Sequence, residues 1–388
     1  MAASASAQNT MTSSPYSMFG LGEMASGLYG QNTSMAGVTV GMREGMLMNI
    51  ENPAGLTALD SCKLFAEASA FVKNERYRSD GSSSSAFTGN FSAFSLGGRI
   101  MRRWYMSVGV TPYSFVGYYF KSSQELEGSP GTFVTSTFSG TGGLSKAFLS
   151  QGFSLTKHLS VGMNLNFIFG NMTLNEIQSA MTVSREMSGR SFYADFGLQY
   201  HRPIARETFL TVGAIYGYKQ RISLKNTVTV TGSSTETPYN QKRVTQYLPQ
   251  YIGIGSSLAH KKWTYALDYL FRQYGVLNSS DSRVKFRDSH ELRLGVCYFP
   301  NGFSSSSYWK RMSYKAGVSV STPYLRLKGQ SGGAYRVSVG LGLPVLNGRI
   351  NTAFYYDRLQ LQGNALRRDI MGFTVTYTLS EKFYQVKL

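Results

Sequence analysis

Charged residues are scarce in this sequence, and long apolar runs are missing. Only 15% of its 388 residues are charged and 42% are hydrophobic, whereas soluble globular proteins carry about 25% charged residues. No apolar run approaches the roughly 18 residues that a membrane-spanning helix needs. The stretch Leu165–Phe169, for example, is interrupted by Asn166. The composition therefore argues against both an ordinary soluble domain and a bundle of membrane helices.

Residues that build metal centres and disulfide frameworks are equally few. The two cysteines, Cys62 and Cys297, leave one disulfide open, but we prefer to interpret them as small apolar strand residues. The four histidines are scattered without the spacing of a metal site: His158, His201, His260 and His290. No Gly-x-Ser-x-Gly elbow lies between a predicted strand and a helix, and no phosphate-binding loop is present. We therefore expect no metal, no cofactor and no enzymatic activity.

The net charge of +18 is high, but the basic residues are not clustered. No run of five or more Lys or Arg occurs, which argues against a nucleic-acid partner. Basic residues fall instead at predicted short turns, such as Arg102-Arg103, Lys261-Lys262 and Lys310-Arg311. There we expect solvated turn residues near lipid head groups, with docking of a periplasmic partner as the alternative.

What the sequence has in abundance is alternation. Between Leu159 and Gly170 large apolar side chains occupy every second position, which places them on one face of a strand. Fourteen such strands are predicted, centred near residues 68, 95, 108, 142, 164, 196, 212, 252, 267, 293, 317, 339, 354 and 375. An even number of strands with one apolar face is typical of an all-β, transmembrane antiparallel β-barrel.

The predicted connections alternate between short and long. The turns at Arg102-Arg103, Ala259–Lys262 and Val345–Gly348 are short. Long polar loops are expected over residues 76–88, 115–132, 171–190, 218–244 and 274–287. Outer-membrane barrels have short periplasmic turns and long extracellular loops. An open sheet edge would leave backbone groups unpaired in lipid, so we expect residues 61–388 to form a closed barrel of about 14 strands.

The first sixty residues follow another pattern. Residues 1–8 contain Ala5-Ser6-Ala7, which fits a signal-peptidase site, and we interpret them as the residual tail of a secretion signal. Residues 9–60 are rich in Gly, Met and Ser and show little alternation. They are too polar for lipid, and a fourteen-stranded barrel is wider than its own side chains can fill. We therefore predict that residues 9–60 form a hatch, or plug, inside the lumen.

Several motifs resemble those of the long-chain fatty acid transporter (FadL-like) family of outer-membrane proteins. They are Ser34–Gly37, Asn52–Leu56, Gly109–Tyr113, Tyr247–Pro249 and Gly340–Pro344. The resemblance implies a hatch that ends at an Asn-Pro-Ala motif, here Asn52, Pro53 and Ala54, followed by fourteen strands. It also implies uptake of hydrophobic molecules, which bind in the lumen and leave when the hatch moves, often through a lateral gap in the wall.

Charged residues at inward-facing strand positions form a second candidate site. We expect them to pair in a polar network that braces the hatch against the wall, because buried charges need partners. The predicted members are Asp195, Asp268, Arg272, Glu291, Arg293 and Arg336, with Glu67 and Asp357 on the same inward face. Paired carboxylates also suit hydrolysis, but no serine or histidine nucleophile accompanies them at a recognisable spacing.

These observations lead to one main hypothesis and two rivals. The main hypothesis is a channel of the bacterial outer membrane for uptake of hydrophobic, fatty acid-like molecules, gated by the hatch. In the second, the barrel is a non-transporting subunit of a larger outer-membrane complex for protein secretion or assembly. The third is a membrane enzyme. Expected partners are outer-membrane lipid and lipopolysaccharide, the hydrophobic ligand and, in the second hypothesis, other outer-membrane or periplasmic proteins.

Overall fold

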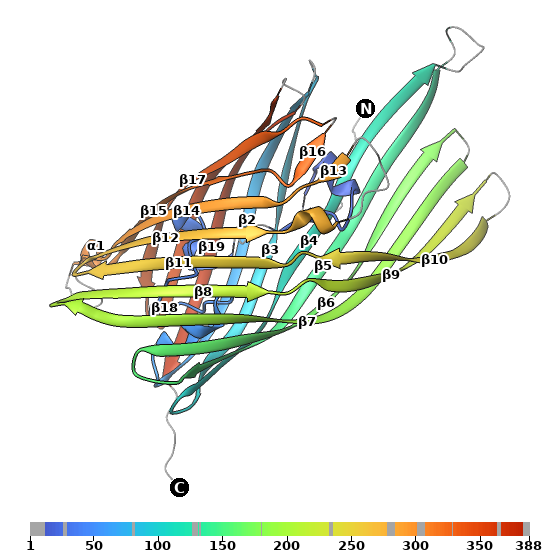
Figure 1. Cartoon of the computed structure of the whole chain (residues 1–388). Helices are drawn as coiled ribbons and strands as arrows, with labels where there is room; N and C mark the ends of the chain where they lie inside the picture. Colours follow the sequence, from blue (N-terminus) through green and yellow to red (C-terminus); the bar gives the residue numbers. More distant parts are fainter. Residues whose placement is uncertain are drawn as a thin grey trace.

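The chain folds into a closed β-barrel around its own N-terminal segment (Figure 1). The computed structural model describes residues 12–25, 29–79, 82–125, 131, 133–179, 181–232, 236–277, 284–300, 307–327, 329–362 and 366–382. Residues 1–8, interpreted above as the tail of a secretion signal, lie outside the described residues.

Hydrogen-bonded strands form the whole wall. They are β2 (Lys63–Ser79), β3 (Ser82–Met101), β4 (Trp104–Glu125), β5 (Phe133–Ser154), β6 (Leu159–Gln178), β7 (Met181–Ala205), β8 (Thr208–Gly217), β9 (Gln220–Thr231), β10 (Glu236–Leu248), β11 (Tyr251–His260), β12 (Trp263–Arg272), β14 (Ser289–Tyr298), β15 (Ser313–Ser321), β17 (Gly332–Val345), β18 (Gly348–Leu361) and β19 (Arg367–Lys382). β8 and β9, and likewise β10 and β11, each form one interrupted strand. Counted this way the barrel has fourteen strands, which confirms the prediction, and the pairing of β19 with β2 closes it.

The outer face of the wall is apolar and the inner face is polar. In β19, Phe373 and Val375 point outward and are exposed, whereas Thr374 and Thr376 point inward and are buried. An apolar outer band is what a bilayer requires of a barrel, and it confirms the period-two interpretation. Within the described residues, no helix has the length and hydrophobicity to cross a bilayer.

One end of the barrel carries short turns and an aromatic rim. Arg102-Arg103 and Lys261-Lys262 form two of these turns. Trp104 begins β4, Trp263 begins β12, and Trp309 lies in α1 (Tyr308–Arg311) between β14 and β15. All three tryptophans of the chain therefore lie at this end, where aromatic side chains suit the boundary between lipid and water.

The opposite end corrects the expectation of long loops. β4 continues to Glu125 before β5 begins at Phe133, and β9 and β10 stay paired out to Thr231 and Glu236. Most residues expected in loops are thus paired strands that extend the barrel on one side (Figure 1). Both faces of such extensions lie outside the apolar band, which removes the alternating signal on which the loop prediction relied.

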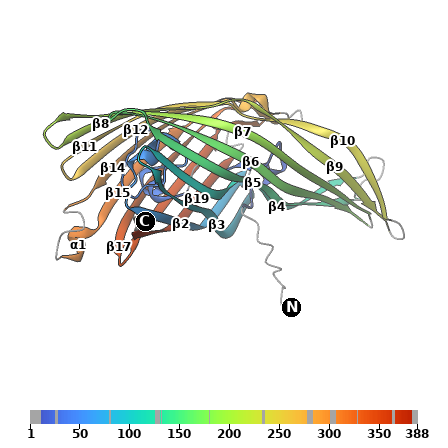
Figure 2. The same ribbon diagram turned by 90° about the horizontal axis from the view of Figure 1, so that it is seen from below.

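Residues 12–25 and 29–60 run through the interior of the barrel (Figure 2). Their short elements are η1 (Pro15–Met18), β1 (Glu23–Met24), η2 (Gln31–Met35) and η3 (Pro53–Ala58). η3 contacts β4 to β7, whereas η2 contacts β14, β15, β17 and β18 on the other side of the ring. The segment therefore fills the width of the lumen between opposite parts of the wall.

Wall glycines show how closely this segment packs. A Cβ atom on Gly317 of β15 would lie 2.3 Å from the carbonyl carbon of Met35. A Cβ atom on Gly162 of β6 would lie 2.4 Å from the backbone nitrogen of Ala54. Glycine is present at these positions because no larger residue leaves room for the backbone of the N-terminal segment. The two cysteines are free thiols. Cys297 is a half-buried residue of β14, as predicted, whereas Cys62 is exposed in the turn before β2, which corrects its interpretation as a strand residue.

Candidate functional site

Two neighbouring wall strands, β3 and β4, separate in the half of the barrel that carries the long hairpins. β3 pairs with β4 only from Met101–Trp104 to Phe94–Val110. Among the described residues, no pair joins β3 before Phe94 to β4 after Val110. We call this parting of the two strands the seam; in Figure 1 the β2–β3 and β4–β5 hairpins diverge there.

The residues at the start of the seam explain why the strands separate. Ser92 is an extra residue in the pairing of β3 with β2, and Tyr113 is an extra residue in the pairing of β4 with β5. Such bulges bend a strand and increase its twist. Pro112, which precedes Tyr113, has no N–H to donate to a neighbouring strand. Both strands are therefore bent where their pairing ends.

The N-terminal segment takes the place of β3 along the free edge of β4. β1 pairs with β4, with Glu23 opposite Phe115 and Met24 opposite Ser114. The Ala25 backbone N–H donates to the Tyr113 carbonyl at 3.0 Å. The Ser17 hydroxyl accepts from the N–H of Gly117 at 3.0 Å and donates to its carbonyl at 3.2 Å. These bonds satisfy backbone groups of the β4 edge that β3 leaves unpaired.

The same segment is tied to the other side of the seam. Glu23 forms an ion pair with Arg368 of β19. Ser13 donates from its backbone N–H to Glu75 of β2 at 3.1 Å, and Thr12 donates to the same carboxylate at 3.3 Å. Residues 12–25 thus bridge the seam from inside the barrel.

An apolar cluster fills the lumen beside the seam. It joins the N-terminal segment to the inner faces of β4, β5, β6, β7, β9 and β10: Leu21, Met24, Val116, Tyr118, Leu144, Ile168, Met172, Tyr193, Ile222, Leu224, Leu248 and Leu277. η4 (Tyr274–Val276) and the small sheet of β13 (Val284–Phe286) and β16 (Leu325–Leu327) adjoin it. The Tyr324 ring lies 4.8 Å from that of Tyr274 and 6.4 Å from that of Phe286. These loops add aromatic side chains to the cluster.

Two small cavities lie along the N-terminal segment. One, of about 80 Å³, is lined by Ser92 and Phe115 of the seam and by Glu23. The other, of about 110 Å³, includes Lys146 and Asp195. Sites for drug-sized ligands typically occupy ~300 Å³ or more. Neither of these two cavities has room for a long-chain ligand. A larger cavity of about 730 Å³ lies at the short-turn end, where Met46 of the segment, Lys63 and Leu346 line it.

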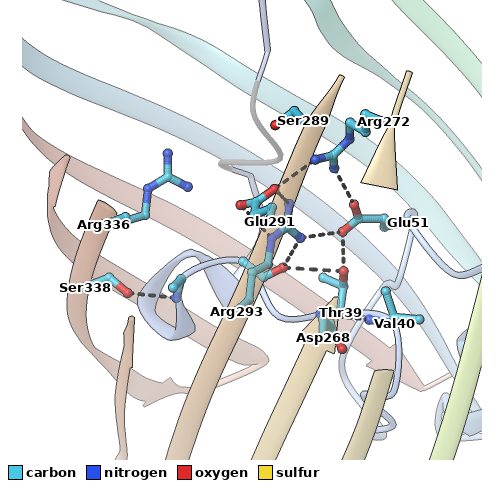
Figure 3. A network of polar contacts seen from close by, with 12 residues as sticks. Thr39, Val40, Glu51, Asp268, Arg272, Ser289, Glu291, Arg293, Arg336 and Ser338 are labelled. Atoms are coloured by element: carbon cyan, nitrogen blue, oxygen red, sulfur yellow. Dashed lines mark hydrogen bonds and ion pairs between the residues drawn. The ribbon is translucent and has the colours of Figure 1, made fainter. Parts of the chain in front are cut away.

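The predicted charged residues assemble around a residue of the N-terminal segment that was not predicted, Glu51 (Figure 3). Its carboxylate lies 3.2 Å from Arg272 and 3.1 Å from Arg293. Glu291 pairs with the same two arginines, at 2.8 Å from Arg272 and 2.9 Å from Arg293. Asp268 accepts the backbone N–H groups of Thr39 and Val40 at 2.6 and 2.9 Å. These contacts attach the segment to β12 and β14.

Four of the predicted residues lie outside this cluster. Asp195 accepts from Asn164 at 2.5 Å and from Asn166 at 2.7 Å. Asn164 also donates to the Ile50 carbonyl at 2.9 Å, which connects this group to the segment. Arg336 instead pairs with Asp357 at 2.5 Å on the neighbouring strand. Glu67 accepts from Thr378 at 3.0 Å.

Asn52, Pro53 and Ala54 are buried against β6 and β7. The Asn52 amide donates to the carbonyls of Val40 at 2.7 Å and Leu198 at 3.2 Å, and its oxygen accepts the Ala54 N–H at 3.2 Å. Asn52 thereby caps η3, and Pro53 occupies the first turn, where its missing N–H costs nothing. The tripeptide fixes a turn of the segment against the wall.

Burial alone would raise the pKa of the Glu51 carboxyl group. Arg293 and Arg272 outweigh burial and hold that pKa below its usual range. Glu44 behaves in the same way beside Arg349, whose guanidinium lies 2.6 Å away. Both carboxylates of the segment are therefore charged when they bind the wall.

Sequence reasoning missed the partners that the segment itself contributes. Glu23, Glu44 and Glu51 each pair with a wall arginine. A signal was available, because a segment predicted to lie in a charged lumen carries few carboxylates, and each needs a cation. The strand registers that decide which arginine pairs with which carboxylate were not accessible from the sequence.

Known proteins resemble this structure over most of its length. The toluene transporter TbuX of Ralstonia pickettii matches with a TM-score of 0.61 and 14% identity, over 92% of this chain and 98% of that one. The toluene transporter TodX of Pseudomonas putida gives 0.60 and 16%, over 92% and 99%. A FadL homologue of Pseudomonas aeruginosa gives 0.60 and 11%, over 93% and 100%. At these identities the FadL-like resemblance is confirmed as a resemblance of fold.

Comparison by sequence gives a family but no individual relative. A family model described as BamG matches residues 1–387. Comparison with curated proteins gives no match.

Proposed function

The chain belongs to the BamG family. We propose that it is a bacterial outer-membrane channel for uptake of hydrophobic small molecules, with residues 9–60 as its hatch. The observation that carries the proposal is the seam, an interruption of the wall that residues 12–25 close from inside, next to an apolar lumen. The fold shared with the toluene transporters TbuX and TodX supports it.

The chemistry of the lumen fits an apolar ligand that enters from the long-hairpin end. Aromatic and aliphatic side chains line the inner wall there, and Leu21 and Met24 of the hatch occupy the space between them. A ligand gains burial free energy in this cluster at about 25 cal/mol per Å² of apolar surface. The hatch must shift for a fatty acid-sized molecule to enter this cluster, because the two cavities beside it measure only about 80 and 110 Å³.

A reversible tether of the hatch tests this proposal. In a variant with both native cysteines replaced, Met24→Cys and Ser114→Cys place two thiols at paired positions of β1 and β4. We expect oxidation to abolish uptake of radiolabelled oleate into cells that carry the channel, and reduction to restore it. Val318→Cys and Val337→Cys, paired on β15 and β17 and both outward-facing, are the matched control. Equal uptake by oxidised and reduced M24C/S114C would contradict the proposal.

The ion pairs that attach the hatch to the wall favour a second function. Ion pairs of Glu51, Glu44 and Glu23 with wall arginines hold it in place, as expected of a barrel that serves as a non-transporting subunit of an outer-membrane complex. Purification from native membranes in mild detergent separates the two functions. A stoichiometric protein partner together with absent uptake would favour the subunit, whereas a bound apolar ligand and no partner would favour the channel.

A further inference from the structure

Four arginines gather on the outer face of the wall, away from the lumen. Arg76 and Arg78 lie on β2, Arg358 on β18 and Arg367 on β19. In the strand register Asp369 is opposite both Arg358 and Arg76, and Arg367 is opposite Arg78. Side chains at directly opposed positions lie about 5 Å apart on one face. The four arginines therefore form one patch, the arginine patch, with Asp369 at its centre.

The patch is pre-arranged. Asp369 accepts from Arg358 Nε at 2.7 Å and from Arg367 Nε at 2.8 Å, and the Tyr356 hydroxyl donates to it at 2.6 Å. The Arg358 guanidinium also lies 5.5 Å from the Tyr356 ring centre and 6.0 Å from that of Tyr335. Asp369 thus fixes two side chains through their Nε atoms, and the Arg358 side chain also contacts the Tyr356 hydroxyl. Within the described part of the chain, no hydrogen bond of the Arg367 terminal nitrogens is found.

Charge and exposure show that the patch is not a closed network. The Arg358 and Arg367 side chains are 30% and 34% exposed, against 13% for Asp369. Arg76 and Arg78 are exposed, and no ion pair of either is found among the described residues. Four arginines and one aspartate leave a net charge of +3. Such a surface favours an anion with several oxygens, because guanidinium groups bind phosphate in a bidentate manner.

The position of the patch indicates which anion it meets. The row of paired residues directly below it, toward the short turns, contains Val337, Tyr356, Met371 and the polar Asn74, and the next row contains Val339, Phe354, Phe373 and Val72. The patch thus lies where the apolar band ends, on the long-hairpin side. A molecule that touches all three rows has a phosphorylated head and acyl chains, whereas an acidic soluble protein would meet only the upper row.

From this geometry we infer that the arginine patch binds the phosphate groups of a phosphorylated glycolipid in the outer leaflet, with the acyl chains on the apolar rows below. The inference concerns the outside of the barrel and does not depend on transport. It does depend on the long hairpins facing outward.

The test uses the full-length barrel in zwitterionic nanodiscs, titrated with bisphosphorylated lipid A. R76Q/R78Q/R358Q/R367Q should bind at least tenfold more weakly than the wild type. The matched control, R102Q/R103Q/R202Q/R206Q, removes the same charge from exposed positions at the short-turn end and should bind unchanged. Replacing the four patch arginines by lysine should restore part of the affinity, and a heat-modifiable gel shift verifies that each variant is folded.

The remaining arms identify the source of the phosphate. Wild-type barrel should bind dephosphorylated lipid A as weakly as the glutamine variant, and millimolar inorganic phosphate should not displace the intact lipid. Unchanged lipid affinity in the patch variant, an equal loss in the control, or full displacement by inorganic phosphate would each overturn the inference. So would loss of a co-purifying acidic protein with lipid affinity intact.

Discussion

The residues next to Glu51 in the sequence do not indicate that its carboxylate contacts wall arginines. It is the carboxylate through which the hatch reaches both Arg272 and Arg293, and Arg293 is almost fully buried. Removing one member of a buried ion-pair group costs ~3–5 kcal/mol, because the remaining charges stay desolvated. Glu291 still pairs with both arginines, so the loss from removing Glu51 falls on the attachment of the hatch more than on the wall.

Glu51→Gln should therefore loosen the hatch without unfolding the barrel. We expect amide protection of residues 36–54 to fall by about 2 kcal/mol of opening free energy, less than the ~3–5 kcal/mol of a fully buried pair because Glu51 is partly accessible. Hydrogen exchange measured by mass spectrometry checks this. Glu381→Gln, an exposed rim carboxylate, is the control and should leave protection unchanged. Equal protection in E51Q and wild type would show that the ion pairs do not hold the hatch.

The same carboxylate makes hatch attachment depend on pH. The folded-state pKa of Glu51 lies below its ordinary value, which is about 4.3 for glutamate. Its contribution is then fully present above about pH 4.3 and is lost as the pH falls through the lowered pKa. We expect the Glu51-dependent part of hatch protection, measured as the difference between wild type and E51Q, to be constant from pH 8 to 5 and to decrease below about pH 4. Protection should therefore decrease less in E51Q than in the wild type; the same decrease in both proteins would assign it to other groups.

At the scale of strands, the alternation in the sequence was sufficient to predict the strands of the wall but not the seam between β3 and β4. Each strand that crosses the apolar band reveals itself locally, because lipid constrains every second residue, as in β6 between Leu159 and Gly170. The seam depends on which residues of β3 and β4 pair, and that register is set by bulges at Ser92 and Tyr113. The arginine patch likewise joins Arg76 to Asp369, which the sequence keeps far apart until β19 closes on β2.

Glycines of the wall strands leave the space that the backbone of the hatch occupies. Gly317→Val would place side-chain atoms where the backbone of Met35 lies, and overpacking of this kind costs ~1–3 kcal/mol. We expect the barrel to form while η2 leaves its seat, detected as faster protease cleavage within residues 31–42. Gly333→Val on β17, where an added Cβ meets nothing within 4 Å, should cleave at the wild-type rate. Cleavage of G317V at the wild-type rate would show that the wall, and not the hatch, shifts to accommodate the valine.

At the scale of the whole molecule, the folding of the barrel wall is largely independent of the hatch inside it. The wall satisfies its own backbone through closure of β19 on β2, so it does not need the hatch to avoid unpaired strands except at the seam. There β4 relies on β1, Ser17 and Ala25 for its partners. Removing the hatch should therefore spare the ring of strands but expose both a lumen and one strand edge.

Deletion of residues 9–55 tests that picture directly. A fourteen-stranded ring is too wide for its side chains to fill, so the emptied barrel should admit small polar solutes. We expect higher passive permeability of proteoliposomes to a small sugar, measured by swelling, while the heat-modifiable gel shift of the folded barrel persists. In the control, Gly-Gly replaces the exposed turn residues Leu346-Asn347. This substitution should leave permeability low. If the correctly inserted deletion variant stayed as tight as wild type, residues 9–55 would not be what closes the lumen, and the wall or the loops at the long-hairpin end would have to close it alone.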